Sequence, residues 1–198
     1  YYFRMFWILI PGLKHISHLP EFSANEYVIM TDAARLIRNG DSPYQRHRFR
    51  HSPILPLMMV LNHKYWHGVG KLFYCMCDIL TCVLIRNVMR KTSGKRGPSH
   101  DQIQKLIAIF WLFNPFIVYI TCRGYQDTLV VMLVMATLNL LMYRRITLAG
   151  VCFGWACHFK LYPVIYFVPF LFWIMTLSGW MPPRNQNASF LASLSSLA

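Results

Sequence analysis

The 198-residue chain is 56% hydrophobic, has a mean hydropathy of +0.35 and carries a formal net charge of +13. This composition excludes an ordinary soluble domain and is typical of a protein that crosses a membrane several times. The aromatic residues lie in long apolar runs and do not alternate with the basic ones, so the charge does not indicate a nucleic-acid binder. The six cysteines include no Cys-x-x-Cys pair, and we therefore expect no metal site.

The chain begins with an apolar stretch, residues 1–13, which we interpret as the end of a membrane helix that starts further upstream. Residues 14–68 then form a polar, basic segment. Within it, apolar residues of 26–39 recur near every 3.6 positions, which predicts a short amphipathic helix on the bilayer surface that stops before Gly40. Thr31 and Asp32 can begin a helical turn there. A second apolar patch at 54–61 is expected to return along the surface.

Three arginines alternate along the chain after this helix: Arg46, Arg48 and Arg50. An extended backbone would direct all three side chains to one side. Planar guanidinium groups form paired hydrogen bonds with phosphates, so the sequence predicts a lipid phosphate as the partner of this loop.

A helix that crosses a bilayer needs about 20 mainly apolar residues. Five later stretches reach or approach this length: 69–88, 103–122, 128–143, 146–158 and 161–180. We expect Asn114-Pro115 to bend the second of them and Lys160 to mark a hinge between the last two. Gly150-x-x-x-Gly154 would permit close helix approach. Residues 182–198, rich in Ser, Ala and Leu, form an atypical tail. The predicted fold is all-α and polytopic, with about five complete membrane helices and a partial first one.

Orientation follows from the loop between residues 86 and 105, which contains six basic residues and only one acid. Such a loop is expected on the cytoplasmic side. Alternation then places residues 14–68, Arg123 and Lys160 on the opposite side of the membrane. The segment 14–68 is itself basic and would be expected on the cytoplasmic side, so its position on the other side needs an explanation. Phosphate binding would explain this, and so would a solvated face whose orientation is imposed by the flanking helices.

Seven short motifs occur in register: Thr31-Asp-Ala-Ala-Arg35, Ser42-Pro-Tyr44, Arg46-x-x-x-Arg50-x-Ser-Pro53, Gly70-Lys-Leu-Phe73 with Asp78, Asn114-Pro115, Arg123-Gly-x-x-Asp-Thr128 and His158-Phe-Lys-Leu-Tyr-Pro163. Together they resemble the family of GPI mannosyltransferase I, the catalytic subunit that adds the first mannose to the glycosylphosphatidylinositol precursor. The resemblance covers about residues 26–173.

The resemblance implies a multi-spanning endoplasmic-reticulum enzyme of the GT-C class. Such an enzyme moves mannose from dolichyl-phosphate-mannose to the glucosaminyl-phosphatidylinositol intermediate, with an α-1,4 bond, on the luminal side. It also implies a small membrane subunit that stabilises the enzyme. No cofactor is indicated beyond the lipid-linked donor substrate.

The candidate site residues follow from the acids and bases on the luminal side. We expect Glu26 and Asp32 to be the catalytic acids, although Asp32 could equally cap its helix. Substrate-binding residues are expected to be Arg46, Arg50, Arg123, Asp127, His158 and Lys160.

Two of the acids allow a structural explanation. Asp127 could shape the sugar site or, as a helix-start acid, pair with the neighbouring Arg123. Here Tyr125-Gln126 replaces the family's usual Asn-Ala. Asp78 falls near mid-membrane, where we expect a structural partner rather than a catalytic role.

The chain departs from the family at one important position. The family's Asp-x-Asp motif before Tyr27 aligns with Ala24 and Glu26, so the first acid is absent. An inverting transferase needs a base that removes the proton of the acceptor hydroxyl. The alternative function is therefore a catalytically impaired or truncated membrane protein that acts as a scaffold. A transporter is disfavoured because the sequence shows no internal repeat.

Overall fold

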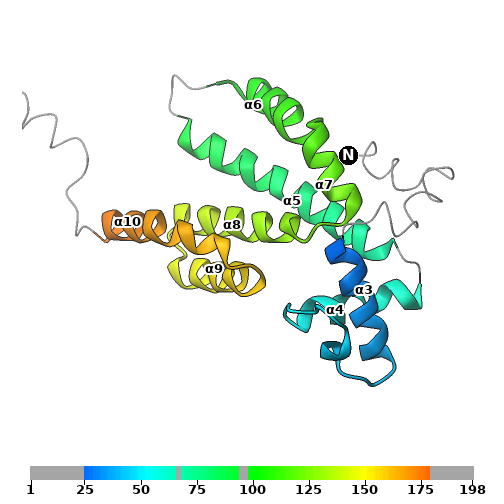
Figure 1. Ribbon diagram of the computed structural model, residues 1–198. Coiled ribbons are helices and arrows are strands. Elements are labelled where there is room, and N and C mark those ends of the chain that lie inside the picture. The colour runs from blue at the N-terminus through cyan, green and yellow to red at the C-terminus, as the bar shows by residue number, and fades with distance from the viewer. Residues whose placement is uncertain (1–24, 66–67, 94–97, 179–198) are drawn as a thin grey trace, which may run out of the picture.

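The computed structural model describes residues 25–65, 68–93 and 98–178, and within these ranges the chain is helical and contains no strand (Figure 1). The predicted all-α fold is confirmed at this level. The predictions for residues 1–13, for Ala24 and for the tail 182–198 lie outside the described residues.

The basic segment folds into two helices joined by a short 3-10 turn: α3 (Asn25–Arg38), η1 (Pro43–Gln45) and α4 (Ile54–Lys64). Helix α3 is amphipathic, as predicted, and buries its apolar face against α4. It ends before Gly40, whose φ of +85° is easily adopted only by glycine. The helix begins at Asn25, however, so the prediction that Thr31 and Asp32 start a turn is wrong, as is the capping role for Asp32.

The predicted extended backbone from Arg46 to Arg50 is also wrong. Arg46 directly follows η1, and Arg48 adopts a left-handed conformation with φ of 67°. The turn brings Phe49 into the core, where its ring is 6% exposed and contacts Tyr44 edge-on. Because the backbone turns here instead of staying extended, the alternation in sequence does not decide on which side the three arginine side chains lie.

The apolar stretches form the remaining helices: α5 (Val69–Thr92), α6 (His100–Ile107), α7 (Pro115–Arg123), α8 (Asp127–Met142), α9 (Ile146–Phe159), η3 (Tyr162–Tyr166) and α10 (Phe167–Leu177). Judged by length and composition, α5 can cross a membrane, and α6 with α7 passes the same test if counted as one bent span. The other apolar helices are shorter. The count of five complete spans therefore stays a prediction.

The bend between α6 and α7 lies at Asn114-Pro115, as the sequence predicts. A π-helical turn (Ala108–Leu112) precedes it, and the two helix directions differ by 54°. Asn114 caps α7 by accepting a hydrogen bond from the Phe116 N–H at 3.0 Å. Pro115 occupies the first helical position, where a missing N–H costs nothing.

The helix ends gather in two groups at opposite ends of α5. Helices α5 and α8 lie side by side and run in the same direction, since Asn139 donates to the Leu84 carbonyl at 3.1 Å and Lys91 to the Met142 carbonyl at 2.7 Å. One group thus contains the end of α5, the end of α8 and the start of α9. The start of α6 joins it through a cluster of Cys82, Ile103 and Ile107. The other group contains the starts of α5 and α8, where α3 and α4 pack. This arrangement is the one that alternating spans require.

One predicted packing feature is not found. A Cβ atom added at Gly150 or Gly154 would meet nothing within 4 Å in the described part of the chain. The prediction that these two glycines allow close approach of another helix is therefore wrong within the described residues.

Candidate functional site: a lysine between two carboxylates

A polar cluster forms where α3, α8 and α9 meet. The Lys160 ammonium lies 3.3 Å from both carboxylate oxygens of Glu26 and 3.0 Å from the carboxylate of Asp127. Lys160 follows α9 with an extended backbone, so its side chain leaves the helix axis and turns back toward α3. Its side chain is 19% exposed, whereas those of the two acids are about one third exposed. Lys160 thus holds two carboxylates that remain partly exposed to solvent.

Gln126 joins this cluster from the turn before α8. Its amide Nε2 donates to Glu26 Oε2 at 3.1 Å and lies 3.4 Å from His51 Nδ1. The residue is 1% exposed, and its Oε1 has no hydrogen-bond partner within the described residues. A buried acceptor without a donor is costly, so the placement of this amide has to be compensated by the packing and by the hydrogen bond of its Nε2.

The base of the cluster is fixed by a buried network around Tyr27. Asn62 donates to the Tyr27 hydroxyl at 2.9 Å and accepts from the Gly70 N–H at 2.6 Å, which ties α3, α4 and α5 together. Burial raises the pKa of Tyr27, so its hydroxyl stays neutral. The buried Lys71 ammonium lies 5.4 Å from the centre of the Tyr27 ring. Because Tyr27 follows Glu26 directly, this network holds the carboxylate in place.

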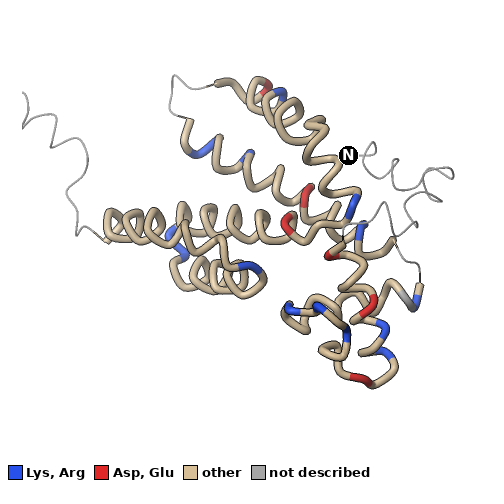
Figure 2. Tube along the Cα trace, viewed as in Figure 1, with Lys and Arg blue, Asp and Glu red and all other residues tan. Residues whose placement is uncertain are grey.

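The basic loop contributes a second ion pair beside the cluster. Arg46 Nε donates to Asp32 at 2.9 Å, and both side chains are about one third exposed. His158 Nε2 lies 2.9 Å from the Ser52 hydroxyl. Arg50 and Arg48 are exposed to solvent. Figure 2 shows that this region carries charges of both signs, whereas α10 carries none.

Arg123 and Asp78 have other contacts. Arg123 donates to the Tyr119 hydroxyl, and its guanidinium also lies near the Tyr125 ring. Asp78 is fully buried and accepts from Trp111 Nε1 at 2.7 Å and from the Thr121 hydroxyl at 3.2 Å. Asp78 thus links α5 to the bent pair α6–α7 and acts as the structural partner that the sequence suggested.

The structure brings together three of the predicted site residues: Glu26, Asp127 and Lys160. Their sequence separations are large, up to 134 residues between Glu26 and Lys160. Asp32 pairs with Arg46 instead of joining them. The sequence analysis missed Gln126 and His51; the departure from the family's usual residue at Gln126 was the signal that could have identified it.

Comparisons with known proteins show to which family the chain belongs. The family model described as "GPI transamidase subunit PIG-U" matches residues 2–197. The chain belongs to this family. The curated relatives that match the chain have a different name. The chain is 34% identical over 168 residues to "GPI mannosyltransferase 1" of Saccharomyces cerevisiae, covering 84% of this chain and 40% of the relative.

Two further relatives carry similar names. The chain is 31% identical over 172 residues to "GPI mannosyltransferase 1" of Dictyostelium discoideum, covering 86% of the chain and 38% of the relative. It is 37% identical over 144 residues to "GPI alpha-1,4-mannosyltransferase I, catalytic subunit" of Danio rerio, covering 73% and 36%. The resemblance to GPI mannosyltransferase I is confirmed. The chain spans about two fifths of the length of these relatives.

Proposed function

We propose that the protein is a multi-pass mannosyltransferase of the endoplasmic-reticulum membrane. It would move the first mannose from dolichyl-phosphate-mannose to the glucosaminyl-phosphatidylinositol intermediate, forming an α-1,4 bond on the luminal side, in a GT-C-like fold. The observation that carries this proposal is the convergence of Glu26, Gln126 and Lys160 from distant parts of the chain, together with the names of the curated relatives.

Glu26 is the residue to which we assign the base. The acceptor hydroxyl gives its proton to this carboxylate as its oxygen bonds to the anomeric carbon of mannose. The bond from that carbon to the phosphate oxygen breaks, and dolichyl phosphate leaves with the electron pair. Glu26 fits this role because it is held by Gln126 and Lys160 yet remains partly exposed.

The neighbouring residues would position the two substrates. Arg46 and Arg50 supply guanidinium groups for the donor phosphate, with Asp32 orienting Arg46. Gln126 holds Glu26 in place by donating to its carboxylate. We assign Lys160 to the orientation of Glu26 and Asp127, because its ammonium already contacts both. His158 and Arg123 lie at the border of this region. A small membrane subunit would in addition stabilise the whole protein.

A substitution in the full gene product that contains this chain tests the proposal. Glu26→Gln keeps the shape of the side chain but cannot accept the proton, so GPI anchors should not return to the surface of cells that lack the first mannosylation step. Asp41→Asn is the matched control, since Asp41 is an exposed acid of the same segment. It should restore anchors as well as the unchanged protein does. Failure of the unchanged protein at normal expression would overturn the proposal.

A second candidate function follows from the family description and from Ala24. The matched family is described as a transamidase subunit, and the first acid of the Asp-x-Asp motif is absent. A non-catalytic protein would then restore anchors in cells lacking that subunit and not in cells lacking the first mannosyltransferase. Expression in both cell lines separates the two functions.

A further inference from the structure

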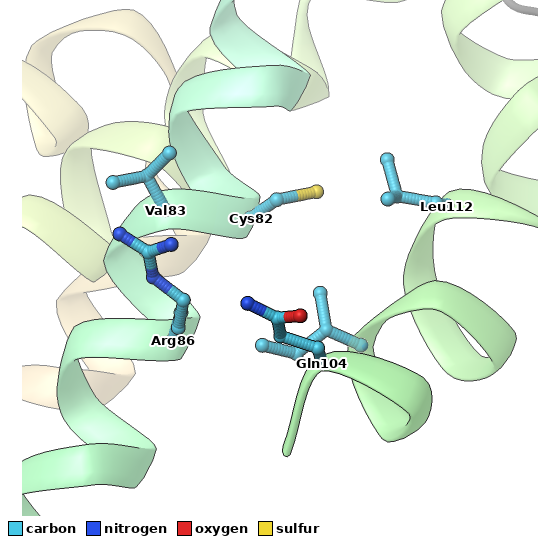
Figure 3. Close-up of a pocket in the computed structure, with 6 residues that line it drawn as sticks. Cys82, Val83, Arg86, Gln104 and Leu112 are labelled. Atoms are coloured by element: carbon cyan, nitrogen blue, oxygen red, sulfur yellow. The ribbon is translucent and has the colours of Figure 1, made fainter. Parts of the chain in front are cut away.

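A cavity of about 290 Å³ lies between α5 and α6, far from the Glu26–Lys160 cluster. Its lining comes from both helices and from the π-helical turn that follows α6: Cys82, Val83, Arg86, Gln104, Ile107 and Leu112 (Figure 3). This volume is that of roughly ten water molecules. Arg86 follows Gly70 by 16 residues along α5, which places it about 24 Å further along the helix axis. The cavity therefore belongs to the opposite group of helix ends.

One polar atom of an arginine that lines the cavity lacks a partner in the described part of the chain. The Nε of Arg86 is buried and has no hydrogen-bond partner within the described residues. None of the lining residues is acidic. A buried N–H donor without an acceptor is costly, and the rest of the half-buried guanidinium lies beside the cavity with no acid among its lining residues. The site is thus suited to a ligand that brings a negative charge.

The cavity is also polar at one end and apolar at the other. Arg86 and Gln104 lie toward the end of α5 and the start of α6, whereas Cys82, Ile107 and Leu112 lie deeper along the same helices. The outer surface beside the deep end is apolar as well, with Ile109 63% and Phe110 68% exposed. This order of a cation near the helix ends and apolar side chains below it matches the order of headgroup and acyl chain in a phospholipid.

We propose that this cavity binds the phosphate headgroup of an anionic phospholipid, with Arg86 as the cation and Gln104 as a neutral hydrogen-bond partner. The acyl chain follows the apolar lining between α5 and α6. Arg90 and Lys105, which are exposed near the same helix ends, add to the positive field that attracts the lipid. Neither the mannosyl donor nor the acceptor is involved, so the proposal is independent of the proposed function.

The test measures lipids that remain bound to the purified full protein. The protein is placed in nanodiscs of phosphatidylcholine with added phosphatidylserine, which is neither substrate of the proposed reaction, and is then released for native mass spectrometry. The unchanged protein should retain phosphatidylserine in preference to phosphatidylcholine. Arg86→Leu should lower this retention about tenfold, as expected for the loss of a charge-assisted contact. Arg145→Ala, which removes an exposed arginine between α8 and α9, should not change it.

Several results would overturn the proposal. Equal phosphatidylserine retention by the unchanged protein and Arg86→Leu would do so, and so would equal retention of the two lipids. Stabilisation by inorganic phosphate through Arg86, without lipid retention, would assign the site to free phosphate.

A photoreactive amino acid in place of Gln104 provides a second measurement if Arg86→Leu does not fold. It should cross-link to a phospholipid. Cross-linking to another protein instead would show that a protein partner fills the cavity.

Discussion

At the scale of single residues, the candidate site depends on one ammonium group. Lys160 forms ion pairs with two acids that come from different helices, and all three side chains are only partly exposed. Without the lysine, the two carboxylates would face each other across a region of reduced solvent access, where like charges repel more strongly than in water. The lysine is thus required for the geometry of Glu26 whether or not it touches substrate.

Lys160→Met should lower the free energy of unfolding by about 1–2 kcal/mol, a value between those of exposed and buried ion pairs. Adding Asp127→Asn should recover part of the loss, because the repulsion between the acids disappears. Thermal unfolding in detergent measures both changes. Lys105→Met, which removes an exposed lysine of α6, should change stability by less than about 0.5 kcal/mol. Equal losses in the two variants would contradict the role of Lys160.

At the scale of helices, α3 approaches the end of α7 so closely that only glycine fits. Gly124 has φ of +79°, and a Cβ atom there would lie 2.6 Å from Cδ2 of Tyr27. Gly40 has a similar φ of +85°, but a Cβ atom there would meet nothing within 4 Å. Substitutions at the two glycines therefore distinguish the cost of a left-handed backbone, present at both, from the cost of a steric clash, present only at Gly124.

Gly40→Ala should cost about 1–2 kcal/mol of stability from the left-handed backbone alone. Gly124→Ala should cost a further 1–3 kcal/mol or so, because the new methyl group displaces Tyr27 from its network. Denaturation of the two variants in parallel gives the difference. Equal costs would show that the contact between α3 and α7 is looser than described.

The bent pair α6–α7 depends on the hydrogen bond between Trp111 and Asp78. Trp111→Phe removes this donor from a fully buried carboxylate and should lower stability by about 1–3 kcal/mol. Trp173→Phe on α10 changes the same residue type at a position that is 38% exposed and should have a small effect. Unfolding midpoints of both variants make the comparison, and a smaller effect at Trp111 than at Trp173 would refute it.

At the scale of the whole molecule, the two groups of helix ends should lie on opposite sides of the membrane. Tyr44 and Leu161 are exposed on the same side as the Glu26–Lys160 cluster, which we propose to be luminal. In a background without native cysteines, Tyr44→Cys and Leu161→Cys should therefore be protected from an impermeant thiol reagent in intact microsomes. His100→Cys and Arg145→Cys should react. Labelling of position 44 in intact microsomes would place the Glu26–Lys160 cluster in the cytosol and remove the basis of the luminal assignment.

The sequence by itself determined the helical character of the chain, the stop of α3 before Gly40 and the bend at Asn114-Pro115. These features depend on local properties: hydrophobic period, the freedom of glycine and the missing N–H of proline.

The tertiary structure alone decided which polar residues meet. Local patterns contain no information about contacts between residues 100 or more positions apart, so neither the pairing of Glu26 with Lys160 nor the role of Gln126 could be read from spacing. Likewise, the arginine loop follows the burial of Phe49 and the pairing of Arg46 with Asp32, not its alternation. The packing of distant apolar faces positions the helices, and this packing determines which charged side chains lie within reach of one another.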